Sequence, residues 1–151
     1  MKDKLRIETI PIEQIDLIKP LWENLRNYLQ ERSTHFTNHM KRLSFEKRKA
    51  GLLQKDALHL LLAKNDSTPV GYCISAIEDS EGMIESLFVS SDFRKCRIGE
   101  MLIGDSLKWL EGHGVQSVSL NVSEGNEQVM DFYRKWGFEV KIYKLTKVNP
   151  Q

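Results

Sequence analysis

The stretch FRKCRIGEMLIG, residues 93–104, gathers three basic side chains just before an apolar segment. Residues 98–112 carry apolar side chains at helical spacing, and glycines end the pattern. The first turn of such a helix offers unpaired backbone N–H groups and a partial positive charge. Arg94, Lys95 and Arg97 would strengthen its attraction for an anion. The stretch therefore predicts either a phosphate-binding loop or a solvated basic turn.

Strand-like segments flank this loop and helix on both sides. Residues 83–90 form an apolar run before the loop, and residues 115–123 favour a strand after the helix. A strand, a crossover helix and a further strand predict a parallel pair inside a mixed sheet. The expected fold class is therefore α/β.

The remaining segments extend this pattern in both directions. Residues 57–64 and 69–79 enclose a polar turn and predict an antiparallel hairpin, and residues 138–148 alternate and predict a strand that closes the sheet. Ser44 is a candidate N-cap, and Pro20 predicts a kink in the first helix. The expected strands are residues 4–10, 57–64, 69–79, 83–90, 115–123 and 138–148, and the expected helices are residues 12–31, 45–53, 98–112 and 126–137.

The composition fits one globular domain that covers residues 1–151. The chain is 40% hydrophobic and 28% charged with a net charge of +1, which argues against a nucleic-acid partner. No apolar run approaches the roughly 18 residues of a membrane span, and the first residues lack the core of a signal peptide. Cys73 and Cys96 show no redox or metal spacing, so we expect a cytoplasmic protein that does not bind membranes.

The histidines do not predict a metal site. His35 and His39 stand four positions apart in the segment HFTNH. The Glu of an HExxH motif is missing between them, and no third ligand is evident. We therefore expect no bound metal.

The second half of the chain contains two motifs, one after the other. Residues 94–99 read RKCRIG after a strand that ends in SLFV, and residues 126–138 read NEQVMDFYRKWGF. They resemble the GNAT acyltransferase patterns [R/Q]-x-x-G-x-[G/A] and N-x-x-A-x-x-[FL]-Y-x-x-x-G-F. The resemblance covers about residues 57–148. It implies a mixed, mostly antiparallel twisted sheet, with helices on both faces and a central parallel strand pair that splays at the coenzyme site.

The resemblance also implies an activity and a donor site. It implies an N-acetyltransferase that passes an acetyl group from acetyl-CoA to a primary amine by direct attack. By resemblance, backbone groups of Leu87 and Val89 hold the thioester carbonyl and the pantetheine arm, where residues 83–90 and 115–123 splay apart. The implied coenzyme-binding residues are Leu87, Phe88, Val89, Arg94, Lys95, Cys96, Arg97, Ile98, Gly99, Glu100, Asn126 and Tyr133.

Glu85 is the candidate general base. A carboxylate on a central strand is costly unless it is paired or lines a wet cleft. In the segment MIESLFV its alternation with the apolar positions is imperfect, so the sequence leaves its face open. Glu85 would accept the proton of the amine directly or through a water molecule.

Tyr133 is the candidate general acid. A phenol has a pKa of about 10, and the thiol that forms from the thiolate has a pKa of about 8.5. The phenol therefore needs favourable positioning to protonate the thiolate. The alternative is a core aromatic on an amphipathic helix, since Tyr133 follows Val129 at helical spacing. Asn126 resembles the coenzyme-contacting Asn of the family, and it would also serve as an N-cap.

Two positions depart from the family patterns. Val129 replaces a small Ala, and Arg97 occupies the place of the first loop glycine. Glycine is needed where the backbone approaches a ligand closely or takes a positive φ. We therefore expect Arg97 to hold a near-helical backbone, with its charge offsetting the missing glycine.

The sequence does not distinguish between several possible amine acceptors. Residues 12–31, 34–42 and 45–53 are expected to shape its pocket, for a peptide N-terminus, a lysine, a polyamine or an antibiotic amine. An alternative to the enzyme is a non-catalytic acyl-CoA-binding or protein-interaction domain on the same fold. A homodimer that pairs through the strand expected at residues 138–148 is a further alternative to a monomer.

Overall fold

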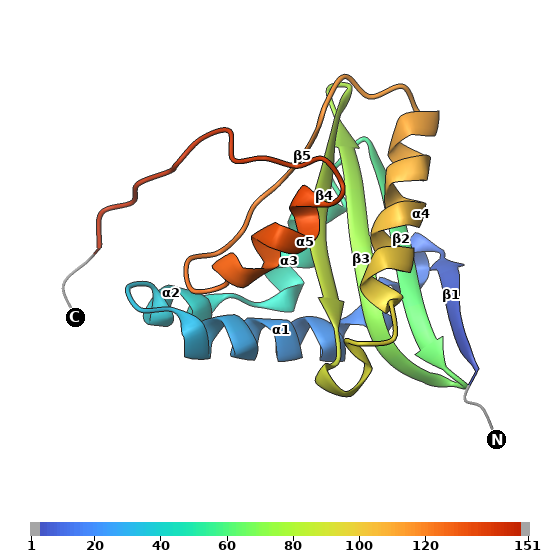
Figure 1. Ribbon diagram of the computed structural model, residues 1–151, viewed down its shortest axis with the longest axis horizontal. Coiled ribbons are helices and arrows are strands. Elements are labelled where there is room, and N and C mark those ends of the chain that lie inside the picture. The colour runs from blue at the N-terminus through green and yellow to red at the C-terminus, as the bar shows by residue number, and fades with distance from the viewer. Residues whose placement is uncertain (1–3, 149–151) are drawn as a thin grey trace. The chain divides into compact units, whose positions relative to one another are not determined.

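The computed structural model describes residues 4–148 (Figure 1). The chain forms two compact units, each described on its own. The first unit contains the residues up to Leu25 and Ser44–Leu120. The second contains Arg26–Leu43 and the residues from Asn121 onward.

The first unit is built on a sheet of five strands in the order β1-β2-β3-β4-β5. The β1–β2, β2–β3 and β3–β4 pairs are antiparallel, and β4 pairs with β5 in parallel. The predicted hairpin and the predicted parallel pair are therefore confirmed. The strands are β1 (Leu5–Ile10), β2 (Ala57–Asn65), β3 (Thr68–Glu78), β4 (Glu81–Val89) and β5 (Val118–Leu120).

Helix α4 (Ile98–Gly112) makes the crossover between β4 and β5, and its bounds are those predicted from the sequence. It packs against β2, β3 and β4 (Figure 1). Its buried positions follow the helical period and include Ile98, Leu102 and Leu110, which are at most 1% exposed. Burial of this apolar stripe fixes the helix and therefore the loop that leads into it.

The first unit also contains α3 (Phe45–Leu52) and the 3₁₀ helix η1 (Ile12–Ile18), which precedes α1 (Lys19–Arg32). The Ser44 hydroxyl accepts a hydrogen bond from the Lys47 N–H at 3.2 Å, which confirms the predicted cap. Pro20 does not kink a continuous helix, because the 3₁₀ helix ends at Ile18 and Pro20 lies in the first turn of α1.

The second unit contains three short helices, α2 (Thr37–Arg42), η3 (Glu127–Val129) and α5 (Met130–Arg134). Residues 34–42, which lie outside the helices expected from the sequence, are therefore partly helical. The helix expected over residues 126–137 is shorter and divided into two types. Gly137 has φ +90°, which ends the helical pattern where the sequence predicts its end.

The carboxylate of Glu124 organises the second unit. It accepts hydrogen bonds from the Thr34 N–H at 2.9 Å, the His35 N–H at 3.1 Å and the Ser33 hydroxyl at 2.8 Å. These donors, the Thr34 N–H first, lower the pKa of Glu124. Gly125 follows with φ +91°, and a Cβ there would collide with the carbonyl group of Arg32. Glu124 and Gly125 therefore fasten this segment to the end of α1.

Two predicted strands differ in the structure. The strand expected over residues 115–123 is reduced to β5, and the strand expected over residues 138–148 is wrong, since those residues form no ladder. Ile142, Tyr143 and Leu145 are 76%, 84% and 94% exposed. Alternation supplies only a strand propensity, and a strand forms only where a partner pairs and one face is buried.

No helix within residues 4–148 is long and apolar enough to cross a bilayer.

Candidate functional site

Strand β4 contains a β-bulge at Glu85. Ser86 is opposite Ile74 and Ile84 is opposite Ser75, so Glu85 is an extra residue with no partner on β3. A bulge bends its strand and turns a side chain out of the regular alternation. This register shift is the physical reason for the imperfect alternation of the sequence around Glu85.

The β4–β5 pairing ends where the bulge begins. Residues Gly82–Ile84 pair with Val118–Leu120, and no later residue of β4 pairs with β5. Leu87 and Val89 lie beyond this point, so their backbone groups on the β5 side are outside the ladder. The β4–β5 ladder therefore ends just before the segment of β4 to which the resemblance assigns the acyl donor.

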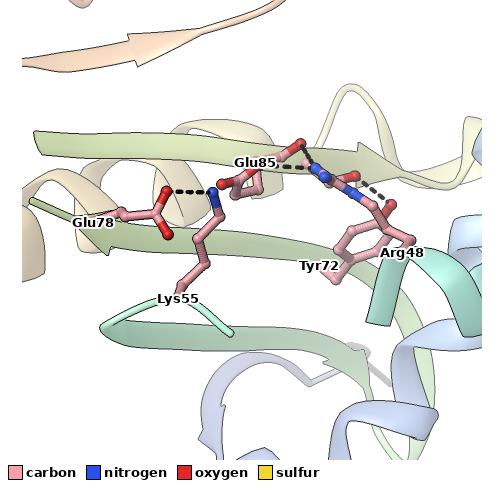
Figure 2. Close-up of polar contacts among 6 residues, drawn as sticks. Arg48, Lys55, Tyr72, Glu78 and Glu85 are labelled. Atoms are coloured by element: carbon pink, nitrogen blue, oxygen red, sulfur yellow. Dashed lines mark hydrogen bonds and ion pairs between the residues drawn. The ribbon is translucent and has the colours of Figure 1, made fainter. Parts of the chain in front are cut away.

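The Glu85 carboxylate forms an ion pair with Arg48 of α3 (Figure 2). The Nη2 of Arg48 is 2.9 Å from Oε1 of Glu85 and 3.0 Å from the Glu85 carbonyl oxygen. The Glu85 side chain is 5% exposed, whereas that of Arg48 is 37% exposed. The carboxylate is thus both buried and paired, as a charge on this strand requires.

Tyr72 forms the next polar contact along the bulged strand. Its hydroxyl is 2.7 Å from the Ser86 hydroxyl, and its side chain is fully buried on β3. Lys55 and Glu78 form a separate, more exposed ion pair at 3.1 Å, at the left of the close-up (Figure 2). No motif marks Arg48 or Tyr72 in the sequence, and only the folded sheet shows their proximity to the bulge.

Arg97 is the N-cap of α4 and adopts a left-handed backbone with φ 62° and ψ 19°. The expectation of a near-helical backbone is therefore wrong. This conformation costs a non-glycine residue about 1–2 kcal/mol, because its Cβ crowds the following carbonyl oxygen. The chain turns here as a glycine would, so that the Arg97 carbonyl accepts the Met101 N–H at 3.1 Å and starts the helix.

The loop before α4 exposes most of its predicted binding residues. Lys95, Cys96, Arg97 and Glu100 are exposed, and no side chain caps the helix. The first backbone N–H groups of α4 therefore remain available to an anion at the most basic segment of the loop. Glu100 adds one negative charge to the same turn.

Arg94 and Ile98 have structural roles at this loop, through a hydrogen bond and through packing in the core. Arg94 is exposed, but its Nε donates to the Val89 carbonyl oxygen at 3.0 Å and its guanidinium lies 5.8 Å from the centre of the Phe88 ring. Ile98 is 1% exposed and belongs to the core, so only its backbone can face a ligand. Gly99 is half-buried beside it.

The two cysteines have opposite environments. Burial raises the pKa of the Cys73 thiol to about 11, and the Ser106 hydroxyl donates to its sulfur at 3.2 Å. Cys96 is free and exposed in the loop before α4. With a thiol reagent at mildly alkaline pH, we expect Cys96 alone to react quickly and Cys73 to react only after unfolding. Fast reaction of both thiols in the native protein would contradict this assignment.

The remaining predicted site residues belong to the second unit. Tyr133 is half-buried on α5, with its ring edge-to-face against Phe132 at 5.2 Å and Phe138 at 5.9 Å. Asn126 precedes η3, but its side chain makes no cap bond and instead accepts from Gln128 Nε2 at 2.8 Å. Asn126 therefore stands at the N-cap position, but the prediction that its side chain caps the helix is wrong.

Within residues 4–148 no group of three or more His, Cys, Asp and Glu side chains could hold a metal ion. The ring of His35 packs edge-to-face with Phe36 at 6.4 Å.

Comparisons with known proteins agree with this architecture. Residues 22–138 match the family model described as the acetyltransferase (GNAT) family. The chain is 32% identical over 97 residues to the uncharacterized N-acetyltransferase MJ1207 of Methanocaldococcus jannaschii, an alignment that covers 60% of this chain and 43% of that protein. It is 30% identical over 109 residues to the peptidyl-lysine N-acetyltransferase YjaB of Salmonella typhimurium, covering 72% and 68% of the two proteins.

A solved structure shows the same fold at lower identity. The aminoglycoside N-acetyltransferase AAC(6')-Iy in complex with CoA superposes with a TM-score of 0.65 and 17% identity, covering 97% of this chain and 95% of that one. The early end of the β4–β5 ladder, the bulge and the basic loop before α4 thus accompany a family match that spans most of the chain. The protein belongs to the GNAT acetyltransferase family.

Proposed function

We propose that the protein is an N-acetyltransferase that transfers an acetyl group from acetyl-CoA to a primary amine. The observation that carries this proposal is the bulge at Glu85. It lies where β4 and β5 cease to pair and is followed in sequence by the exposed basic loop of α4. This arrangement offers a carboxylate, backbone groups outside the β4–β5 ladder and an anion-attracting helix start on one strand and its crossover.

The acyl donor is proposed to bind along the end of β4. The backbone groups of Leu87 and Val89 lie outside the β4–β5 ladder and can bond an amide-containing arm, although the Val89 carbonyl oxygen also accepts from Arg94 Nε. The N–H groups at the start of α4, with Lys95 and Arg97, suit a pyrophosphate. The complex of AAC(6')-Iy with CoA supports this choice of donor.

In the proposed reaction a C–N bond and an S–H bond form, and a C–S bond and an N–H bond break. The amine nitrogen attacks the thioester carbonyl carbon, the C–N bond forms, and the C–S bond breaks. Glu85 is proposed to take the proton of the amine, directly or through water. Tyr133 is proposed to give a proton to the departing sulfur, on the strength of its sequence motif. The products are the N-acetylated amine and free coenzyme A.

The relatives support a proposal for the acceptor class. YjaB is described as a peptidyl-lysine N-acetyltransferase and AAC(6')-Iy as an aminoglycoside N-acetyltransferase. Both kinds of acceptor present an amine, which is protonated at neutral pH and must lose a proton before it attacks. We therefore propose a primary amine as the acceptor.

Calorimetric titration with acetyl-CoA tests the donor, with desulfo-CoA and adenosine as probes of the thiol and pyrophosphate contributions. We expect binding that is kept by desulfo-CoA and lost with adenosine. Release of free thiol in the presence of a peptide lysine, a polyamine or an aminoglycoside then tests transfer. Binding without thiol release for any amine would favour a non-catalytic acyl-CoA-binding domain. Absence of binding would contradict the donor assignment.

Arg97 allows its conformational and charge effects to be measured separately. Arg97→Gly should raise the free energy of unfolding by about 1 kcal/mol, because relief of the left-handed strain exceeds the extra chain entropy of glycine. Arg97→Ala keeps the strain and should leave this free energy near that of the wild type. Both changes remove the charge and should weaken acetyl-CoA binding by about tenfold.

Thermal unfolding and calorimetry of the two variants decide between these effects. If Arg97→Gly were no more stable than Arg97→Ala, the left-handed backbone would not be strained. If both variants bound acetyl-CoA as tightly as the wild type, the Arg97 side chain would not contact the donor.

A further inference from the structure

Arg48 lies outside the sequence motifs and contacts the candidate base, Glu85. A single nitrogen, Nη2, donates to both the carbonyl oxygen and the Oε1 atom of Glu85, at 3.0 and 2.9 Å (Figure 2). The carboxylate is 5% exposed, and within residues 4–148 Arg48 is the cation with which it forms an ion pair. Such a charge depends on its partner far more than a surface ion pair does.

Helix α3 is built to hold Arg48 in this place. Phe45, Arg48 and Leu52 are three and four residues apart and share one helix face. Phe45 and Leu52 are 2% and 1% exposed, and the Phe45 ring packs edge-to-face on Trp22 at 5.6 Å. Arg48 therefore lies on the same face of α3 as two core anchors, while its own side chain stays 37% exposed.

The Arg48 contacts match what the bulge leaves incomplete. The extra residue of a bulge is left without a partner in the ladder, and its carbonyl group then needs another donor. Arg48 supplies that donor to Glu85 and binds Oε1 with the same nitrogen. Arg48 binds Oε1, so Oε2 is the oxygen of this carboxylate that Arg48 leaves to accept a proton.

We propose that Arg48 is a positioning residue that fixes the bulge and directs Oε2 of Glu85 toward the acceptor amine or a water molecule between them. This inference rests on the proposed acetyltransferase function. In the proton transfer, Oε2 gains the proton of the amine and the Glu85 carboxylate becomes neutral, while Arg48 keeps its own protons.

A double-mutant cycle on turnover tests the proposal. Arg48→Met should lower kcat by about 10–100-fold, because the base loses its orientation. It should leave the KM for acetyl-CoA unchanged. Removal of a cation 2.9 Å from the carboxylate should also move the acidic limb of the pH–rate profile to higher pH. In the Glu85→Gln background the same change should lower kcat by less than about twofold, since the effect acts through Glu85.

Two further variants separate positioning from folding. Arg48→Lys keeps the charge but not the planar fork, and should recover part of kcat and the wild-type pH profile. Lys49→Ala is the matched control, because Lys49 lies on the same helix and pairs with Asp16 at 2.9 Å instead. Its kcat should equal that of the wild type.

The outcomes against the proposal are distinct. Multiplicative effects of Arg48→Met and Glu85→Gln on kcat would overturn it, and so would an unchanged pH profile in Arg48→Met. If the wild type transferred no acetyl group to any amine, the proposed function would fail and the catalytic part of this inference with it. The coupling of the two changes in the free energy of unfolding would then still show whether Arg48 holds Glu85, and its absence would overturn the contact.

Discussion

Replacement of Glu85 by Gln should lower kcat by about 10²–10³-fold at neutral pH, within the range expected for loss of a general base. Gln is isosteric and its amide oxygen can still accept from Arg48, so the bulge should persist and the protein should stay folded. The loss in kcat should be greatest at low pH, where the largest fraction of the amine is protonated. At high pH the amine becomes neutral without help, and the rate should approach that of the wild type.

A pH–rate profile with acetyl-CoA and the best amine acceptor checks this result. Glu78→Gln is the matched control, because Glu78 lies on neighbouring β3 and forms an ion pair of similar length, 3.1 Å to Lys55, with a side chain that is 51% exposed. That variant should keep the wild-type profile. A Glu85→Gln profile with the shape of the wild type at all pH values would exclude Glu85 as the base.

The parts of the fold that depend on local patterns are predictable from the sequence. Helix α4 begins and ends as expected because its apolar period is sustained over four turns and its loop and glycines mark both ends. The Ser44 cap and the β2–β3 hairpin are recovered for the same reason. These features need only neighbours in the sequence.

The parts that depend on distant pairing are not predictable in this way. Residues 138–148 alternate as a strand does, but all of them except Phe138 are exposed and no strand pairs with them. The bulge at Glu85 is a property of the β3–β4 register, so the segment MIESLFV shows only an irregular alternation. The left-handed backbone of Arg97 is set by how the loop joins β4 to α4, and it contradicts the local preference of arginine.

Arg48 is a candidate site residue that no sequence motif indicates. It is one of three basic residues in the segment EKRK, and composition does not distinguish it from Lys47 or Lys49. The available signal is its spacing from Phe45 and Leu52, which places it on the apolar face of α3. A charged residue at such a position predicts a buried partner, and the partner is the candidate base.

Replacement of Tyr133 by Phe should lower kcat by about 10²-fold, as expected for loss of a general acid. The ring of Tyr133 packs edge-to-face on Phe132 and Phe138, and phenylalanine keeps both contacts. The melting temperature and the affinity for acetyl-CoA should therefore stay unchanged. If Tyr133 were only a core aromatic, the same substitution would leave kcat unchanged as well, so this variant distinguishes the two roles.

Tyr143→Phe supplies the control for the loss of a phenol, because Tyr143 belongs to the same unit and is 84% exposed. Its turnover should equal that of the wild type. The measurement is steady-state release of free thiol at saturating amine, together with calorimetric binding of acetyl-CoA. Wild-type kcat in Tyr133→Phe would remove Tyr133 from the mechanism, and protonation of the departing thiolate would then fall to solvent. A lower kcat accompanied by equally weakened acetyl-CoA binding would instead assign Tyr133 to donor binding.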